Sequence, residues 1–290
     1  MERRRFLGAT VLAAAGCSTA AASRELTAAA ARPASAGALR QSVTRWPFGK
    51  MTVEQLAIEA KGMGLGSLEL IDPDDFATVK SHGLICAMVN APGDPRVRLT
   101  EGFNHVEYHE RLIPQYLRHI DLTADAGFPN VICFSGSRAG ISDEEGLANC
   151  AAGLAKILPA AERRGVTICM ELLNSRVDHK DHQCDRTAWG VALVKRIGSP
   201  RFRLLYDIYH MQIMEGDVIR TIRDNHQWIA HYHTAGVPGR HELDETQELQ
   251  YPAIMRAIKD TGFTGYVAQE FIPVREPMMS LREAVRLCDV

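Results

Sequence analysis

The sequence predicts an α/β fold, a single (β/α)₈ barrel of the TIM type, from three observations. From Gln41 onward, eight short runs rich in β-branched and aromatic residues alternate with eight amphipathic segments. The alternation occupies ~250 residues, which is the usual size of such a barrel. Several of the runs are apolar almost throughout, as is typical of strands that are covered on both faces.

The expected strands and helices follow from this alternation. The strands are predicted at 42–48, 67–71, 84–90, 131–135, 166–174, 203–209, 230–235 and 266–271. The helices are predicted at 53–63, 74–81, 106–126, 143–164, 186–197, 217–225, 251–261 and 278–287. A doubly wound open sheet is the alternative, but it usually has fewer strands and a glycine-rich first turn. The glycine-rich stretch 62–66 follows a helix and precedes a strand, which is the wrong order for a dinucleotide loop.

The first 40 residues are predicted to lie outside the barrel, which we place at 41–290. Residues 1–22 combine three arginines at 3–5, a short apolar run and small residues up to Ala22. This is the layout of a signal peptide, and its paired arginines followed by Phe-Leu resemble the twin-arginine (Tat) export signal. We therefore expect a periplasmic or exported protein, with lipidation at Cys17 or a basic tail as the weaker alternatives. Residues 23–40 are predicted to be a linker.

The composition excludes several classes of protein. Hydrophobic residues make up 46% of the 290 residues, so the chain can bury a large core and is not intrinsically disordered. The 33 Lys and Arg residues nearly balance the 35 Asp and Glu residues. This balance gives no electrostatic reason to bind nucleic acid or an anionic membrane. There is no Cys-x-x-Cys pair, and Cys86, Cys133 and Cys169 lie in apolar runs, which predicts buried free thiols.

Titratable side chains gather at the carboxyl ends of the last four predicted strands. In a (β/α)₈ barrel these strand ends and their loops form the active site. No Lys or Arg lies within these four segments except Arg203, at the far end of its strand. The residues concerned are Glu171, Asp207, His210, His231, His233 and Glu270.

A bound divalent cation explains this cluster better than ion pairing does. A lone buried carboxylate could be a satisfied polar group, but several that converge on one face need positive charge nearby. An oxygen-rich site with one imidazole suits Mn²⁺, Mg²⁺ or Co²⁺, and suits Zn²⁺ less well. The predicted metal ligands are Glu171, Asp207, His233 and Glu270.

Three segments resemble the hydroxypyruvate isomerase family, part of the xylose isomerase-like TIM barrel superfamily that also holds the ketose 3-epimerases. They are Met-Glu-Leu-Leu-Asn at 170–174, Tyr-Asp-Ile-Tyr-His-Met-Gln at 206–212, and His-Thr-Ala-Gly-Val-Pro-Gly-Arg-His-Glu at 233–242. The similarity extends from about residue 41 to about residue 277.

The resemblance implies an enzyme that shifts a proton through a cis-enediol, converting hydroxypyruvate to 2-hydroxy-3-oxopropanoate. By resemblance, Glu171 and Glu270 serve both as metal ligands and as acid/base groups. Asp207 and His233 match the other two ligands. His210 matches a histidine beside a substrate oxygen, and Arg240 is placed to bind a carboxylate or hydroxyl, with a solvated loop arginine as the alternative.

One departure from the family leaves other functions open. Hydroxypyruvate isomerases often have glutamine at the ligand position of the seventh strand, where this chain has His233, as the sugar epimerases do. An exported ketose 3-epimerase or 3-keto-sugar isomerase or lyase is therefore the alternative. A zinc phosphodiesterase of the same barrel is more distant, because it would need more histidines and a basic surface. A non-catalytic sugar-binding protein would not need two glutamates facing one metal. For each of the proposed enzymes except the phosphodiesterase, the expected partner is a small-molecule substrate, either a hydroxy-keto acid or a sugar. The sequence is also compatible with a homo-oligomer.

Other polar and aromatic residues lie near the predicted site. Trp46 and Phe48 could line the pocket or pack in the core, and Glu69 is either a buried partner or a pocket residue. Four polar residues in the loop after the fifth strand could contact substrate, although a solvated loop is the favoured interpretation. These four are His179, Lys180, His182 and Asp185.

Overall fold

The computed structural model describes residues 39–290. The predicted export signal at 1–22, Cys17 and the predicted linker up to residue 38 lie outside the described residues. Arg40, the last residue of the predicted linker, is the first residue of the first strand, so the barrel begins one residue earlier than expected.

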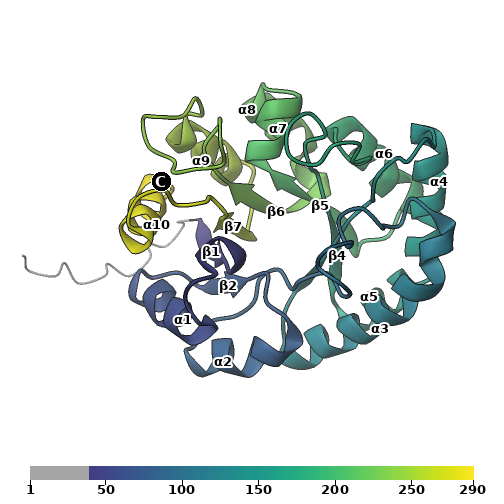
Figure 1. Cartoon of the computed structure of the whole chain (residues 1–290), viewed down its shortest axis with the longest axis horizontal. Coiled ribbons are helices and arrows are strands. Elements are labelled where there is room, and N and C mark those ends of the chain that lie inside the picture. The colour runs from purple at the N-terminus through teal and green to yellow at the C-terminus, as the bar shows by residue number, and fades with distance from the viewer. Residues whose placement is uncertain (1–38) are drawn as a thin grey trace, which may run out of the picture. The chain divides into compact units, whose positions relative to one another are not determined.

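Seven parallel strands form one sheet whose order is β2-β1-β7-β6-β5-β4-β3 (Figure 1). This circular order, with neighbours in sequence also neighbours in space, is that of the predicted barrel. The strands are β1 (Arg40–Thr44), β2 (Ser67–Glu69), β3 (Asn130–Cys133), β4 (Thr167–Glu171), β5 (Phe202–Asp207), β6 (Ile229–Thr234) and β7 (Tyr266–Gln269).

The segment 84–90 takes the place of the eighth strand, between β2 and β3. It pairs with β2 at Ile85 and with β3 at Val89, in both cases through an isolated bridge. The prediction of a regular strand here is wrong because side chains replace part of the ladder. The backbone N–H of Ala87 donates to Ser67 Oγ at 2.9 Å, and Ala87 O accepts from Asn130 Nδ2 at 2.7 Å. The segment still closes the ring of strands.

Ten α-helices lie around the outside of the sheet in the described part of the chain (Figure 1). They are α1 (Val53–Gly62), α2 (Phe76–Ser81), α3 (His109–Ala126), α4 (Asp143–Leu154), α5 (Leu158–Arg164), α6 (Thr187–Ile197), α7 (Ile208–Met214), α8 (Val218–Asn225), α9 (Tyr251–Asp260) and α10 (Pro277–Leu287). Short 3₁₀ turns at Trp46–Phe48, Pro73–Asp75, Val106–Tyr108 and His226–Trp228 complete the connections.

Several boundaries differ from the prediction, and two of the differences have a local reason. The strand predicted at 42–48 ends at Thr44, before the 3₁₀ turn at 46–48. The predicted helix 143–164 is divided into α4 and α5, because Pro159 at the start of α5 has no N–H to continue the helical hydrogen bonds. The strand predicted to reach Tyr209 ends at Asp207, and the unpredicted α7 begins at Ile208. The carboxylate of Asp207 accepts a hydrogen bond from the backbone N–H of His210 at 3.3 Å and so caps this helix.

Buried apolar side chains from the strands and the inner faces of the helices form one continuous core. Cys86, Cys133 and Cys169 are buried free thiols in this core, which confirms the prediction for them. Among the described residues, none of the helices combines the length and apolar character that crossing a membrane requires.

Candidate active site

The structure brings the four predicted metal ligands together at the carboxyl ends of four successive strands. Glu171 ends β4, Asp207 ends β5, His233 lies in β6, and Glu270 directly follows β7. All four are buried, and one donor atom from each lies within 4.8 Å of every other. The local apolar sequence of each strand end buries the polar side chain, and the closed barrel points all four to the same place.

Arg240 joins this cluster from the loop that follows β6. Its Nη2 donates to Asp207 Oδ2 at 3.1 Å and to Glu270 Oε2 at 2.5 Å. The guanidinium also lies over the rings of Trp46 and Tyr209, 5.1 and 5.3 Å from their centres. The expectation that no arginine neutralises these carboxylates is therefore wrong, because a residue distant from the strand segments folds back onto them.

One guanidinium does not balance three buried carboxylates. With all three ionised and Arg240 charged, two negative charges remain, and buried charges of this kind are costly unless a cation compensates them. Burial raises the pKa of Asp207 to about 8, with Glu270 and Glu171 adding to the effect and Arg240 opposing it. Burial likewise raises the pKa of Glu171. Burial acts to raise the pKa of Glu270 too, but His233 and Arg240 outweigh it and hold this pKa well below its usual range.

The donor atoms of the cluster fit a divalent cation. Glu171 Oε1 is buried and has no hydrogen-bond partner among the described residues, although it lies 3.5 Å from His233 Nδ1, which is itself 2.8 Å from Glu270 Oε2. Such an orphaned acceptor is rare in folded proteins and is typical of a group that binds a ligand or ion. A set of three carboxylates and one imidazole matches the ligands that hard and borderline divalent metals prefer.

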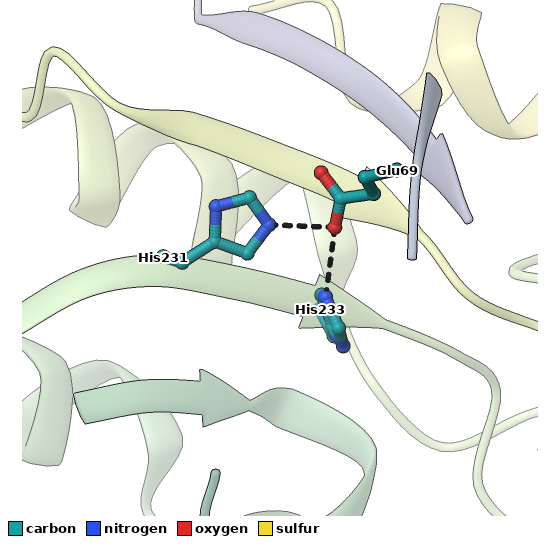
Figure 2. A group of neighbouring side chains, drawn as sticks. All are labelled: Glu69, His231 and His233. Atoms are coloured by element: carbon teal, nitrogen blue, oxygen red, sulfur yellow. Dashed lines mark hydrogen bonds and ion pairs between the residues drawn. The ribbon is translucent and has the colours of Figure 1, made fainter. Parts of the chain in front are cut away.

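His233 also belongs to a second buried group, which it forms with Glu69 and His231 on the side of its ring away from the cluster (Figure 2). Glu69 at the end of β2 accepts hydrogen bonds through a single oxygen, Oε1, from His231 Nε2 at 2.8 Å and from His233 Nε2 at 2.9 Å. All three side chains are fully buried. Burial acts to raise the pKa of Glu69, but the two histidines outweigh it and lower this pKa to about 2.

The ionised Glu69 determines which nitrogen of His233 faces the cluster. A carboxylate only accepts hydrogen bonds, so Nε2 of His233 carries the proton and Nδ1 is left facing the three carboxylates. A carboxylate on the far nitrogen of a metal-binding histidine is a common means of fixing its tautomer and orientation. The sequence held one signal for this group: His231 and His233, two residues apart, share a face of one strand.

His210 lies beside the cluster as a neutral imidazole. Its Nε2 is 3.5 Å from Asp207 Oδ2 and 3.1 Å from Arg240 Nη1, and its Nδ1 is 2.6 Å from Asn174 Nδ2. Both of these nitrogen neighbours are donors, and a neutral imidazole accepts through only one of its two ring nitrogens. Burial, with Arg240 adding to it, holds the pKa of His210 well below its usual range.

A cavity of about 280 Å³ opens onto the cluster, and Glu171, Glu270 and Arg240 form part of its wall. Trp46 also lines it, and its Nε1 donates to Glu270 Oε1 at 2.7 Å. Phe48, by contrast, is buried in the core with its ring edge-on to Phe271. Of the two interpretations of this aromatic pair, the pocket applies to Trp46 and the core to Phe48.

The loop after β4 is only partly the solvated loop that we favoured. Lys180 is exposed, but His179 lines the cavity. His182 is buried with Nε2 3.1 Å from Ser135 Oγ, and Asp185 is buried in an ion pair with Arg138 at 3.2 Å. The favoured interpretation is wrong for His182 and Asp185, whose partners lie in loops that the sequence does not place.

A closed parallel barrel, with buried carboxylates and imidazoles facing a cavity at the carboxyl ends of its strands, defines the class of this protein as a TIM barrel with an acidic polar centre. The model of the xylose isomerase-like TIM barrel family matches residues 76–288. The chain belongs to this family, which confirms the predicted fold and the resemblance drawn from the three segments.

Named relatives are similar to parts of the chain. The 2-oxo-tetronate isomerase of Cupriavidus necator is 36% identical over 114 residues, which are 39% of this chain and 43% of that protein. The putative hydroxypyruvate isomerase of Mus musculus is 25% identical over 210 residues, covering 68% of this chain and 73% of that one. The chain thus spans about two fifths of the length of the first of these relatives. A solved structure described as a family 2 AP endonuclease from Brucella melitensis has a TM-score of 0.73 at 22% identity, covers 84% of this chain and 97% of that one, and shows the fold alone.

Proposed function

We propose that this chain is a metal-dependent isomerase that shifts a proton between neighbouring carbons of a small hydroxy-keto acid through a cis-enediol, as in the conversion of hydroxypyruvate to 2-hydroxy-3-oxopropanoate. The observation that carries the proposal is the pair Glu171 and Glu270, which face one cavity from within a buried, negatively charged cluster. The named relatives, a 2-oxo-tetronate isomerase and a putative hydroxypyruvate isomerase, support it. A cavity of about 280 Å³ lies at the small end of ligand pockets, which suits such a substrate.

The metal of the proposal is Mn²⁺, Mg²⁺ or Co²⁺, with Zn²⁺ less favoured. Glu171, Asp207, His233 and Glu270 would hold it. When bound, a divalent cation acts as a Lewis acid on the substrate carbonyl and stabilises the negative charge that develops on its oxygen.

The protein's own groups would move the protons. A carboxylate oxygen of one glutamate takes the proton from the carbon next to the carbonyl, and the other glutamate returns a proton to the neighbouring carbon. The proton of the hydroxyl group passes to the former carbonyl oxygen, which completes the exchange of the two groups. Glu171 Oε1 has no competing hydrogen bond among the described residues, so it is free to accept the proton. Glu270 is held in place by Trp46 Nε1 and Arg240 Nη2. His210 lies beside the cluster and would contact a substrate oxygen.

A second candidate is an exported ketose 3-epimerase or 3-keto-sugar isomerase or lyase. Its support is His233, at the position where hydroxypyruvate isomerases often have glutamine, together with the amino-terminal sequence from which we propose export. Removal of the proton next to the carbonyl by Glu171 or Glu270 would be the shared first step. An epimerase would then return a proton to the opposite face of the same carbon, and a lyase would expel the group bound to the neighbouring carbon.

The deciding experiment follows deuterium from solvent into substrate. The mature protein is stripped of metal, loaded in turn with Mn²⁺, Mg²⁺ or Co²⁺, and offered hydroxypyruvate, 2-oxo-tetronate, ketohexoses and 3-keto-glycosides in D₂O. Deuterium uptake at the carbon next to the carbonyl identifies both the substrate and the step. Full turnover by the metal-stripped protein, or undiminished uptake by Glu270→Gln, would contradict the proposal.

A further inference from the structure

The cavity contains a second arginine that the cluster does not use. Arg98 lies in the loop between the segment 84–90 and α3, and its side chain is half-buried in the cavity wall. No carboxylate lies within ion-pairing distance of it among the described residues. Its one hydrogen bond there runs from Nη1 to Ala91 O at 3.3 Å. The other arginine of the wall, Arg240, is committed to Asp207 and Glu270.

The backbone of the loop directs Arg98 into the cavity. Arg98 N donates to Asp94 O at 3.0 Å and Glu101 N donates to Val97 O at 2.7 Å, so the segment forms a helical turn. On such a turn, residues at i, i+3 and i+4 share one face. Pro95, Arg98 and Leu99 have this spacing, and all three line the cavity.

The order of the strands places Arg98 across the barrel mouth from the metal ligands. The segment 84–90 lies between β2 and β3, four places from β6 in the ring of eight. The loop after this segment therefore faces His233 and its neighbours from the opposite side of the barrel. The same cavity is lined by Arg98 and by Glu171 and Glu270.

We propose that Arg98 binds the carboxylate of the substrate and selects 2-oxo acids over neutral ketoses. A guanidinium forms two parallel hydrogen bonds to a carboxylate, and a half-buried guanidinium without an acidic partner gains most from such a ligand. This assignment transfers to Arg98 the role that the sequence suggested for Arg240. It rests on the proposed function, since it presumes that the hydroxy-keto end of the substrate lies at the glutamates.

The test compares two substrates that differ only in this carboxylate. Hydroxypyruvate carries it, and dihydroxyacetone has a neutral hydroxymethyl group in its place. We expect Arg98→Gln to lower kcat/KM for deuterium exchange with hydroxypyruvate by about 10- to 100-fold, mainly through KM, and to leave dihydroxyacetone nearly unchanged. Arg98→Lys should recover part of the loss, because it keeps the charge without the planar fork.

A matched control lies two residues away in the same loop. Arg96 is 85% exposed and pairs with Asp94, so Arg96→Gln removes the same charge outside the cavity and should change neither substrate. Equal losses for hydroxypyruvate and dihydroxyacetone in Arg98→Gln, or no loss for either, would overturn the inference. A larger loss for dihydroxyacetone phosphate than for hydroxypyruvate would show that the group bound is a phosphate, which would also overturn it.

A binding measurement separates this inference from the proposed function. Glycerate keeps the carboxylate and the terminal hydroxyl group of hydroxypyruvate but has a hydroxyl group in place of the ketone, so it binds without reacting, and glycerol is its neutral counterpart. If the wild type exchanges no deuterium with any substrate but loses glycerate affinity on Arg98→Gln by calorimetry, the isomerase proposal fails and the carboxylate site stands. Unchanged glycerate affinity in that variant would refute the site whether or not the enzyme turns over.

Discussion

Replacing Glu69 by glutamine should both destabilise the protein and weaken metal binding. The change keeps the size of the side chain but removes the negative charge that faces His231 and His233 at 2.8 and 2.9 Å. The fall in the pKa of Glu69 from 4.5 to about 2 corresponds to about 3 kcal/mol of favourable interaction with its ionised form. Loss of one partner from a buried pair typically costs a similar amount.

The stability loss is measurable by urea denaturation and by thermal melting. For a chain of this size, about 3 kcal/mol corresponds to a fall in Tm of roughly 6–12 °C. Because the pKa of Glu69 is lowered in the folded state, its contribution is fully present above about pH 4.5 and is lost as the pH falls toward 2. The difference between variant and wild type should therefore be constant from pH 5 to 8.

Metal affinity gives a second measurement, independent of stability. Without the ionised Glu69, His233 can place its proton on either nitrogen, and the affinity of the four-ligand cluster should fall by about 10- to 100-fold in chelator competition. The control is Glu54→Gln, which affects a Glu–His pair at the surface with His82, where Glu54 is 68% exposed. An E69Q protein with wild-type stability and wild-type metal affinity would refute the reasoning.

Three further predictions concern the cluster and the loop after β4. Glu270→Gln should lower deuterium exchange at least about 100-fold without changing the circular dichroism spectrum, as expected for loss of an acid/base group. Removal of metal with a chelator should abolish exchange and lower the free energy of unfolding by about 2.7 kcal/mol relative to protein with free metal at 100 times Kd, and Mn²⁺ should restore both. The third prediction concerns His182, whose pKa is lowered from 6.5 to about 3 by burial, with His179 adding to the effect. Between pH 3 and pH 6.5 this histidine therefore binds a proton in the unfolded chain but not in the native chain. Relative to His182→Asn, the wild type should lose about 1.4 kcal/mol of stability per pH unit below 6.5 in urea denaturation, and a flat difference would contradict this assignment.

The strand ends of the site could be predicted because their signal is local. Glu171, Asp207 and Glu270 each interrupt an apolar run. Because strands and helices alternate along the chain, the carboxyl end of each run can be assigned to the face of the barrel that holds the active site. Local signals also account for the errors. Ile208 and Tyr209 resemble a continuing strand, and only the capping contact of Asp207 with His210 N shows that a helix begins there.

The long-range contacts that support the site could not be predicted, because nothing near the residues concerned in the sequence indicates them. Glu69 and His231 are 162 residues apart and meet only when the sheet closes into a barrel. Arg240 reaches the cluster because its loop is held by backbone hydrogen bonds from Arg240 N to Gly236 O and from Ile272 N to Arg240 O, at 2.9 and 2.6 Å. Loop paths of this kind depend on tertiary contacts rather than on local propensity.

The division of charge between strands and loops has a consequence for specificity. The strands provide the carboxylates and the imidazole, which are buried and which the barrel positions rigidly, whereas both cavity arginines come from loops. A change at Glu171 or Asp207 alters the balance of buried charge and therefore affects stability and metal binding together. A change at Arg98 removes a side chain without an acidic partner among the described residues, so the barrel loses no ion pair. Substrate choice can therefore change through the loop after the segment 84–90 while the proton-transfer groups stay in place.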